Sequence, residues 1–348
     1  MKKINHANAQ SAMFTEAMEA PEVVARQLEK NRTIVSALAR ELLANDPYSL
    51  VTVARGSSDH AAQYLNYLAG LLLGKLSTSL SLSLVTIYQK AITAERSLAV
   101  AISQSGESPD LIEPMKSFKQ NALSTIALVN AVDSPLAQVV KWVVPLHAGE
   151  EKSIAATKSF IASLTASASL IASMGQLREL QDGLLRLPED LKKAQNLDWS
   201  KAIAKFSKAK RIMVVGRGLG LPLALEAALK FKETCSIQAE AFSSAEIKHG
   251  PQTLIQKGYP LLIFANRGPG LADLLLFAKE MRERKAQVVL VAPIDIKEKD
   301  LIFPETTHPE LDVICAIQAF YLMVEELSQT LGRNPDRPKN LSKVTKTK

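Results

Sequence analysis

A repeat with one constant spacing most constrains how this 348-residue chain can fold. Three strand-and-turn landmarks of the first half recur in the second half, each 162 positions later: Arg55-Gly56 as Arg217-Gly218, Ser105-Gly106 opposite Arg267-Gly268, and Leu128-Val129 as Leu290-Val291. Unrelated domains rarely keep one register over such a length, so the offset predicts two copies of one α/β domain.

Each copy alternates strand-like and helix-like segments. Residues 49–54 are typical of a short strand that ends at Arg55-Gly56-Ser57-Ser58 and leads into a helix over 59–73. Further strand-like runs cover 81–87, 98–102, 123–129 and 142–146, with helical patterns between most of them, and a helix is expected over 155–174. This alternation predicts mainly parallel sheets.

Changes in pattern along the chain suggest its organisation. Apolar residues at helical spacing predict two helices within 1–45, before the first strand. The first α/β domain is expected over 46–190 and the second over 200–332, with the boundary in the polar stretch 186–200. The basic residues 333–348, which include Pro335 and Pro338, are typical of a frayed terminus.

Composition narrows the function classes. The net charge is +7, but residues from Arg333 onward contribute most of it, so a polyanion-binding face is not expected. Two cysteines, Cys235 and Cys315, show no metal-ligand spacing, which fits a reducing cytoplasm and predicts neither a disulfide nor a metal site.

Two segments of the sequence could be mistaken for a signal peptide and a membrane span. Met1-Lys2-Lys3 is followed by Asn5, His6 and Asn8 where a signal peptide would need apolar residues, so secretion is not expected. The longest uncharged run, 159–177, contains many serines and predicts a buried helix rather than a membrane span.

The segment Ser103-Gln104-Ser105-Gly106-Glu107-Ser108 follows a strand and precedes Pro109, a favoured first residue of a helix. Ligands collect at the carboxyl ends of parallel strands, where helix N-termini bind anions. Three hydroxyls around Gly106, with Ser57-Ser58 at the neighbouring strand end, therefore predict a phosphate site. A plain serine cap is the simpler alternative. The second copy has Ala265, Arg267 and Gly270 at the hydroxyl positions.

The segment Gly216-Arg217-Gly218-Leu219-Gly220 departs from a dinucleotide fingerprint because position 221 is Leu. We interpret its glycines as a tight turn that allows close helix packing. In the helix that follows, Lys230 and Glu233 are three residues apart and share a face. A pair facing a cleft, able to hold a substrate oxygen, is preferred to a surface salt bridge.

His249 lies in a polar loop, Glu246 to Pro251. Its ordinary pKa, near neutrality, suits protonation of a ring oxygen, although such a histidine is more often solvated or capping.

These motifs together resemble the sugar isomerase (SIS) family, over nearly the whole chain. The likeness is greatest to the isomerase half of glucosamine-6-phosphate synthases and to SIS-type glucosamine-6-phosphate deaminases. The most specific pieces are 103–108, Ala155-Ala156-Thr157-Lys158, 225–233, 239–242 and 246–251. The resemblance implies two tandem doubly wound, flavodoxin-like SIS domains.

The resemblance also implies roles for individual residues. Ser57, Ser58, Ser103, Gln104, Ser105 and Ser108, with Ala155 and Ala156, would bind the phosphosugar. Glu233, assisted by Lys230, would move a proton between C1 and C2. His249 would open the sugar ring from the neighbouring subunit of a homodimer. The C-terminal tail, 333–348, would reach the active site, where Lys343 would form a Schiff base with the ketose carbonyl. No cofactor is implied.

The sequence departs from the synthase pattern at three positions. Arg55 stands where the synthases have Cys, Ser57 where they have Thr, and Ala156 where they have Ser. The last change removes a hydroxyl that would contact the sugar, and Arg55 could alter how the substrate is held.

The absence of a glutaminase segment before residue 1 favours ammonia release, with glucosamine 6-phosphate and water giving fructose 6-phosphate and ammonia. Cys235, in mid-chain, cannot replace a terminal cysteine nucleophile. One alternative is a deglycase or other isomerase acting on a related phosphosugar such as a fructosamine 6-phosphate. Another is a non-catalytic sugar-phosphate sensor.

Overall fold

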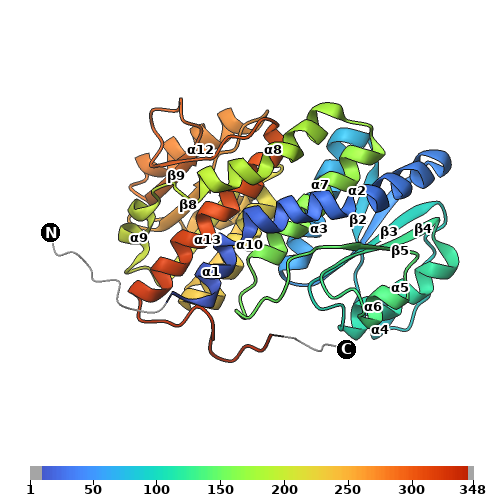
Figure 1. The fold of residues 1–348 in the computed structure, drawn as a ribbon. Helices are drawn as coiled ribbons and strands as arrows, with labels where there is room; N and C mark the ends of the chain where they lie inside the picture. Colours follow the sequence, from blue (N-terminus) through green and yellow to red (C-terminus); the bar gives the residue numbers. More distant parts are fainter. Residues whose placement is uncertain (1–9, 344–348) are drawn as a thin grey trace.

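Two five-stranded parallel sheets lie on either side of a central group of helices (Figure 1). The computed structural model describes residues 10–343. The first sheet has the order β2-β1-β3-β4-β5, and all of its neighbouring strands are parallel. Its strands are β1 (Ser49–Val53), β2 (Leu76–Ser79), β3 (Ser97–Ser103), β4 (Ser124–Val129) and β5 (Trp142–Pro145).

The second sheet repeats this topology. Its order, read from the edge strand β7, is β7-β6-β8-β9-β10. Numbered from β6, this is 2-1-3-4-5, the order of the first sheet. Its strands are β6 (Arg211–Gly216), β7 (Gln238–Ser243), β8 (Pro260–Phe264), β9 (Gln287–Ala292) and β10 (Leu301–Ile302). Both sheets have the flavodoxin-like strand order. The predicted duplication into tandem doubly wound domains is therefore confirmed.

The helices keep the same spacing where they follow the repeated strands. α3 (Ser57–Leu73) matches α10 (Gly220–Cys235), and α5 (Pro109–Asn121) matches α12 (Leu271–Glu283). The other α-helices are α1 (Ala12–Met18), α2 (Ala20–Asn45), α4 (Ser83–Thr86), α6 (Pro135–Gln138), α7 (Lys158–Met174), α8 (Arg178–Ala194), α9 (Ser200–Phe206), α11 (Ser244–Ile247) and α13 (Asp312–Thr330). The two helices expected before the first strand are thus α1 and α2.

The strand expected over 81–87 was wrong. Residues 83–86 form the short helix α4, and the edge strand of the first sheet is β2, over Leu76–Ser79. β2 is largely exposed and carries little apolar pattern. The apolar residues of 81–87 instead belong to a helical turn closed by local backbone hydrogen bonds such as Ile87 to Ser83.

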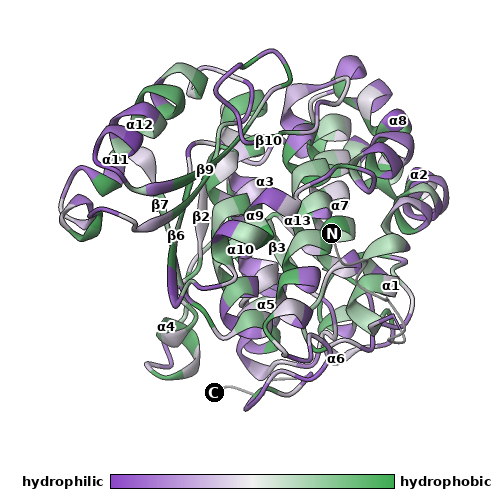
Figure 2. Cartoon of the chain, turned by 90° about the vertical axis from the view of Figure 1, so that its left-hand side faces the viewer, coloured by the Kyte–Doolittle hydropathy of each residue, from purple (hydrophilic) through white to green (hydrophobic). Residues whose placement is uncertain are grey.

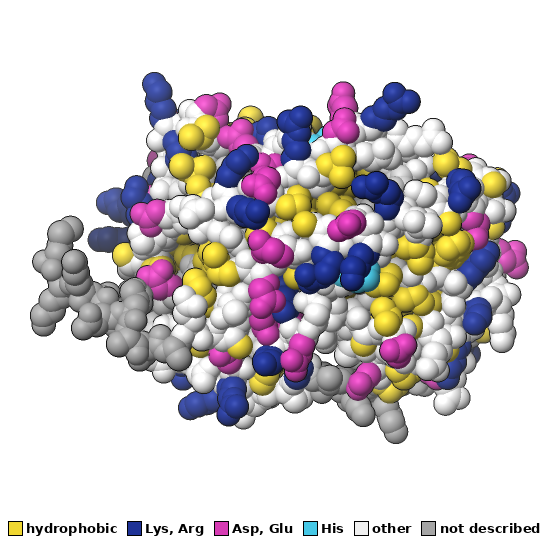
Figure 3. Space-filling view, viewed as in Figure 1, with side chains coloured by type: hydrophobic (Ala, Val, Ile, Leu, Met, Phe, Trp, Pro, Cys, Tyr) yellow, Lys and Arg dark blue, Asp and Glu magenta, His cyan; other side chains and the backbone are white. Residues whose placement is uncertain are grey.

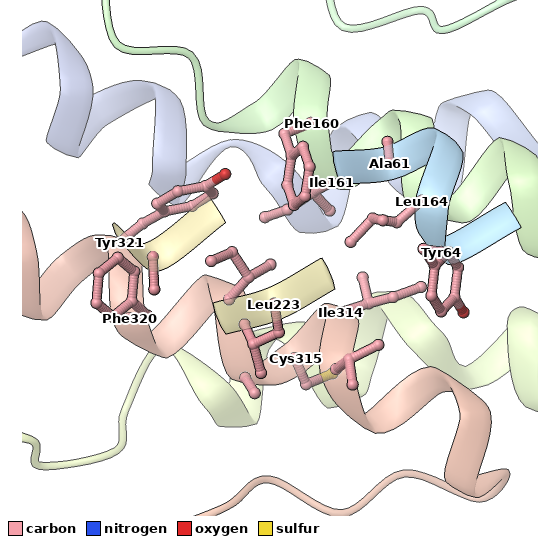
Figure 4. Close-up of a cluster of buried hydrophobic side chains, with 14 of the residues drawn as sticks. Ala61, Tyr64, Phe160, Ile161, Leu164, Leu223, Ile314, Cys315, Phe320 and Tyr321 are labelled. Atoms are coloured by element: carbon pink, nitrogen blue, oxygen red, sulfur yellow. The ribbon is translucent and has the colours of Figure 1, made fainter. Parts of the chain in front are cut away.

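The largest hydrophobic core lies between the two sheets. Figure 2 shows apolar residues on the helices at the centre of the molecule and hydrophilic residues on outer helices such as α8 and α12. In the close-up of Figure 4, this core is built from α3 (Ala61, Tyr64), α7 (Phe160, Ile161, Leu164), α10 (Leu223) and α13 (Ile314, Cys315, Phe320, Tyr321). Because α3 belongs to the first copy and α10 to the second, shared burial holds the two copies together.

α7 shows how a serine-rich segment becomes a core helix. Its hydroxyls bond to carbonyl oxygens one turn earlier: Ser163 to Ser159 at 2.8 Å, Thr165 to Ile161 at 3.0 Å and Ser167 to Ser163 at 2.8 Å. These bonds satisfy polar atoms that would otherwise be costly to bury. Among the described helices, none combines the length and apolar character needed to cross a membrane.

Candidate functional site

The predicted anion site lies where β1 and β3 end side by side. These strands are hydrogen-bonded neighbours, and the order of the sheet reverses between them, with β2 beyond β1 and β4 beyond β3. Such a switch point leaves a crevice at the carboxyl ends of the strands. α3 begins there at Ser57, and α5 begins there at Pro109, directly after the serine-rich turn 103–108. The fold thus brings both groups of serines to one edge of the sheet.

The turn 103–108 is shaped by its own hydroxyls. Gly106 has φ +64°, and its N–H donates to Oγ of the buried Ser103 at 2.9 Å. The N–H of Glu107 donates to Ser105 Oγ at 3.4 Å. A Cβ at position 106 would lie 2.6 Å from Ser134 Cβ, so only glycine fits this turn without rearrangement. Gln104, Ser105 and Ser108 stay partly exposed at its surface.

An ion pair lies beside this turn. Arg55, which follows β1, contacts Asp110 Oδ2 through Nε at 3.0 Å and Nη2 at 2.8 Å. Asp110 is fully buried in the first turn of α5, whereas the Arg55 side chain is 53% exposed. The guanidinium therefore offsets a negative charge at the helix end where the phosphate is expected, and does so from a position open to solvent.

The lysine–glutamate pair of α10 is buried rather than superficial. Lys230 is 1% exposed, and its Nζ lies 2.6 Å from Glu233 Oε2 and 3.2 Å from Glu226 Oε1. It also donates to Ser57 Oγ, at the start of α3, at 3.2 Å. Glu233 keeps 20% of its side chain exposed. This burial excludes the surface salt bridge, and Ser57 joins the pair to the edge of the first sheet.

Glu226 is the centre of this cluster, and sequence reasoning did not single it out. Its Oε1 accepts hydrogen bonds from Ser57 at 3.1 Å and from Tyr321 at 3.0 Å, and its Oε2 faces His60 Nδ1 at 2.9 Å. Its spacing of four residues before Lys230, in an otherwise apolar helix, was the available signal. The contributions of His60 and Tyr321 had no such local signal.

Glu226 and Lys230 of the cluster stay ionised although they are buried. Burial alone would raise the pKa of Glu226, but Lys230, His60 and Ser57 together hold it below its ordinary value. Burial alone would lower the pKa of Lys230, but Glu226 and Glu233 raise it well above the usual value. The pKa of the Tyr321 phenol is raised by burial and then by the nearby carboxylates. Lys230 is therefore an ammonium and Glu226 a carboxylate at neutral pH.

Lys343 reaches a loop between β5 and α7. Its Nζ donates to the carbonyl of Ser153 at 2.5 Å and lies 3.7 Å from Oε2 of the buried Glu151. Glu151 in turn accepts bonds from the N–H groups of Thr157 at 2.9 Å and Ser159 at 3.2 Å, at the start of α7. Ala155 and Ala156 lie in the same loop, with Ala155 fully buried.

The expectation of a frayed tail was wrong for its described part. Asp336 accepts hydrogen bonds from the N–H groups of Ala12 at 2.8 Å and Met13 at 2.7 Å, so it caps α1. Its carbonyl accepts the N–H of Ile154 at 3.3 Å. The segment after α13 therefore runs beneath α1 toward the first domain, as Figure 1 shows. Residues 344–348 lie outside the described residues.

Tyr321 links the tail side of the site to α10. Its hydroxyl donates to Glu226 Oε1 at 3.0 Å, and burial, followed by Glu226, Glu151 and Glu233, raises its pKa. Glu151 is also the carboxylate beside Lys343. Ser57, Lys230 and Glu233 thus form one cluster, and Lys343 contacts the loop that contains Glu151.

His249 is not joined to this cluster within one chain. It is exposed on the turn after α11, and within residues 10–343 no hydrogen bond or ion pair connects its side chain to Lys230 or Glu233. The face seen in Figure 3 carries both signs of charge interspersed, without a single basic patch.

Comparison with known proteins agrees with this architecture. The SIS domain family profile matches residues 42–173 and 205–303. A glutamine–fructose-6-phosphate aminotransferase (isomerizing) of Thermus thermophilus is 33% identical over 86% of this chain and 53% of its own length. One from Methanothermobacter thermautotrophicus is 35% identical over 84% and 50%. The chain thus spans about half the length of these curated relatives.

Solved structures show the same fold. A Silicibacter pomeroyi protein, named as a candidate phosphosugar isomerase, is 37% identical with a TM-score of 0.90, covering 94% of this chain and 100% of that one. The glucosamine-6-phosphate deaminase of Thermotoga maritima is 21% identical with a TM-score of 0.77, covering 97% and 100%, a likeness that concerns the fold alone. Because the profile covers more than half of its residues, this chain belongs to the SIS domain family.

Proposed function

We propose that the site binds a phosphorylated amino sugar, with its phosphate in the turn 103–108. The partly exposed Gln104, Ser105 and Ser108, the Ser58 hydroxyl and the N-terminus of α5 would hold the anion, while Ser103 shapes the turn. Arg55 favours this binding because it neutralises Asp110 nearby. Ala155 and Ala156 would line the sugar.

Glu233 would carry a proton between C2 and C1 of the open sugar. It is the carboxylate of the cluster that keeps solvent exposure, and Lys230 holds it at 2.6 Å. A single carboxylate that removes a proton at C2 and returns it at C1 interconverts an aldose and a ketose. The Lys230 ammonium would stabilise the oxygen charge that develops during this transfer.

The favoured reaction is conversion of glucosamine 6-phosphate and water into fructose 6-phosphate and ammonia. Proton transfer from C2 to C1 turns the 2-amino aldose into a 2-imine, and water then hydrolyses the imine, with no net oxidation. The names of the aminotransferase relatives support an amino sugar substrate. Lys343, already at the loop 151–156, would form a Schiff base with the ketose carbonyl: its amine adds to C2 and water leaves. Hydrolysis of that imine returns the free amine and fructose 6-phosphate.

A homodimer would complete the site. His249 is exposed, and within residues 10–343 it makes no hydrogen bond or ion pair with Glu233. This supports the proposal that it opens the sugar ring in the partner subunit's site. Two buried, unbridged thiols, Cys235 and Cys315, support a cytoplasmic location.

The observation that carries the proposal is the buried Lys230 between Glu226 and the partly exposed Glu233, next to Ser57 at the serine-lined edge. The test is to incubate the protein with glucosamine 6-phosphate, galactosamine 6-phosphate and a fructosamine 6-phosphate, and to measure ammonia, ketose phosphate and free amine. Ammonia with fructose 6-phosphate is expected from the first substrate.

Glu233→Gln should lower kcat by about 10²- to 10⁴-fold, because it removes the proton carrier. The exposed Glu283 of α12 provides the control, and Glu283→Gln should leave kcat unchanged. Free amine from the fructosamine substrate alone would indicate a deglycase. Binding without any turnover would indicate a sensor, and a fully active Glu233→Gln would contradict the assigned role of Glu233.

A further inference from the structure

Lys230 lies between two carboxylates that compete for its ammonium. The shorter contact, 2.6 Å, is to Glu233, and the longer, 3.2 Å, is to Glu226. Glu226 is fully buried, where an unshared negative charge would attract the ammonium strongly. The observed preference for Glu233 therefore depends on other donors that share the charge of Glu226.

These donors divide unequally between the two oxygens of Glu226. Oε1 accepts hydrogen bonds from Ser57 and Tyr321 and forms an ion pair with Lys230. Oε2 faces His60 Nδ1 at 2.9 Å, and within the described residues no other donor contacts this oxygen. Without His60, Oε2 would be a buried carboxylate oxygen lacking a partner, which is costly enough to reorient the side chain.

We propose that His60 is a positioning residue: its Nδ1–H holds Glu226 Oε2, and Glu226 thereby leaves Lys230 bonded closely to Glu233. The inference rests on the proposed function, in which Glu233 carries the proton. His60 is on α3, three residues after the helix begins at Ser57. The helix that brings Ser57 and Ser58 to the substrate edge thus also sets the geometry of the proton carrier.

The test compares two replacements of His60. His60→Phe fills the volume of the ring but donates no hydrogen bond, whereas His60→Asn presents an amide N–H close to the position of Nδ1. We expect His60→Phe to lower kcat about 10- to 100-fold while KM stays within about threefold, because ground-state binding is unchanged. His60→Asn should keep most of kcat.

The control is His308→Leu, which removes a different histidine–carboxylate contact, that of His308 with Glu310, outside the cluster. It should leave kcat and KM unchanged. An unchanged kcat in His60→Phe, or an equal loss in His60→Asn, would overturn the proposal. If His60→Phe does not fold, as judged by its thermal midpoint, His60→Leu replaces it.

Failure of the proposed function can be told apart from failure of this inference. If the unaltered protein turns over none of the phosphosugars, the proposed function fails. Crystal structures of that protein and of His60→Phe then still test the positioning role. The inference expects Lys230 Nζ to move from Glu233 toward Glu226 in the variant, and an unchanged Lys230–Glu233 distance contradicts it.

Discussion

Glu226 shows how one buried side chain can join three helices. Its donors come from α3, α10 and α13, and each separately would be a weak contribution to stability. Together they allow a carboxylate to remain ionised without any exposure to water. The cost of removing one charge from such a group is large, because the opposite charge stays buried.

Glu226→Gln should therefore lower the free energy of unfolding at pH 7 by about 3 kcal/mol, since Lys230 loses one of its two carboxylates. The pKa of Glu226 is lowered in the folded state, so its contribution is complete above the unfolded pKa of about 4.3 and is lost as pH falls through the folded value. Urea unfolding measured at several pH values checks this.

The matched control is Glu113→Gln on α5, which removes an exposed pair with Lys116. We expect that change to stay within about 0.5 kcal/mol at all pH values. A Glu226→Gln deficit that is as large at pH 3 as at pH 7 would contradict the assigned ionisation.

At the scale of elements, the turn between β3 and α5 and the end of α3 allow a direct comparison. Both contain a glycine with positive φ, Gly106 at +64° and Gly74 at +62°. A Cβ at Gly106 would meet Ser134, whereas a Cβ at Gly74 would have no atom within 4 Å. The left-handed conformation would therefore strain a non-glycine residue at either site, but only at Gly106, in the turn proposed to bind the phosphate, would a Cβ also clash.

Gly106→Ala should raise KM for the phosphosugar about tenfold or more, because the turn must shift to relieve the clash with Ser134. Gly74→Ala should cost about 1 kcal/mol of stability from its left-handed conformation alone and leave KM unchanged. Steady-state kinetics and thermal unfolding of both variants check this pair. Equal KM values in the two variants would indicate that the turn does not bind the phosphate.

At the scale of the whole molecule, the two domain copies differ in the residues that they place at the equivalent turn. The first keeps its serine turn, where we propose that the phosphate binds. In the second copy, Arg267 occupies the equivalent turn and is tied to Asp312 at 2.7 Å and to the carbonyl of Thr306 at 2.7 Å. The second copy instead supplies α10 with Lys230 and Glu233, and the exposed His249.

If His249 serves the partner subunit, two inactive variants should complement one another. A mixture of equal amounts of His249→Ala and Glu233→Gln, after subunit exchange, should recover about a quarter of the unaltered activity, since half of the dimers contain one intact site of two. Activity assays before and after exchange measure this, with each variant alone as the control. No recovery, with exchange shown independently, would place His249 outside the shared site.

The amino-acid sequence by itself determined the duplicated architecture and the two local motifs of the site. The offset of 162, the strand runs and the serine turn at a strand end are all readable because each depends on residues close together in the chain. The same holds for Lys230 and Glu233, which share a helix face. The edge strand β2 escaped prediction because its exposed residues carry no apolar pattern.

Only the tertiary structure decided what surrounds these motifs. His60 and Tyr321 reach Glu226 across 166 and 95 positions of sequence, and Asp336 caps α1 across 324. Such partners depend on how the helices pack around the shared core. The residue pattern of one segment does not predict which other helix will pack against it. The packing of α3, α10 and α13 therefore determines where the charges around Lys230 lie, and hence its chemistry.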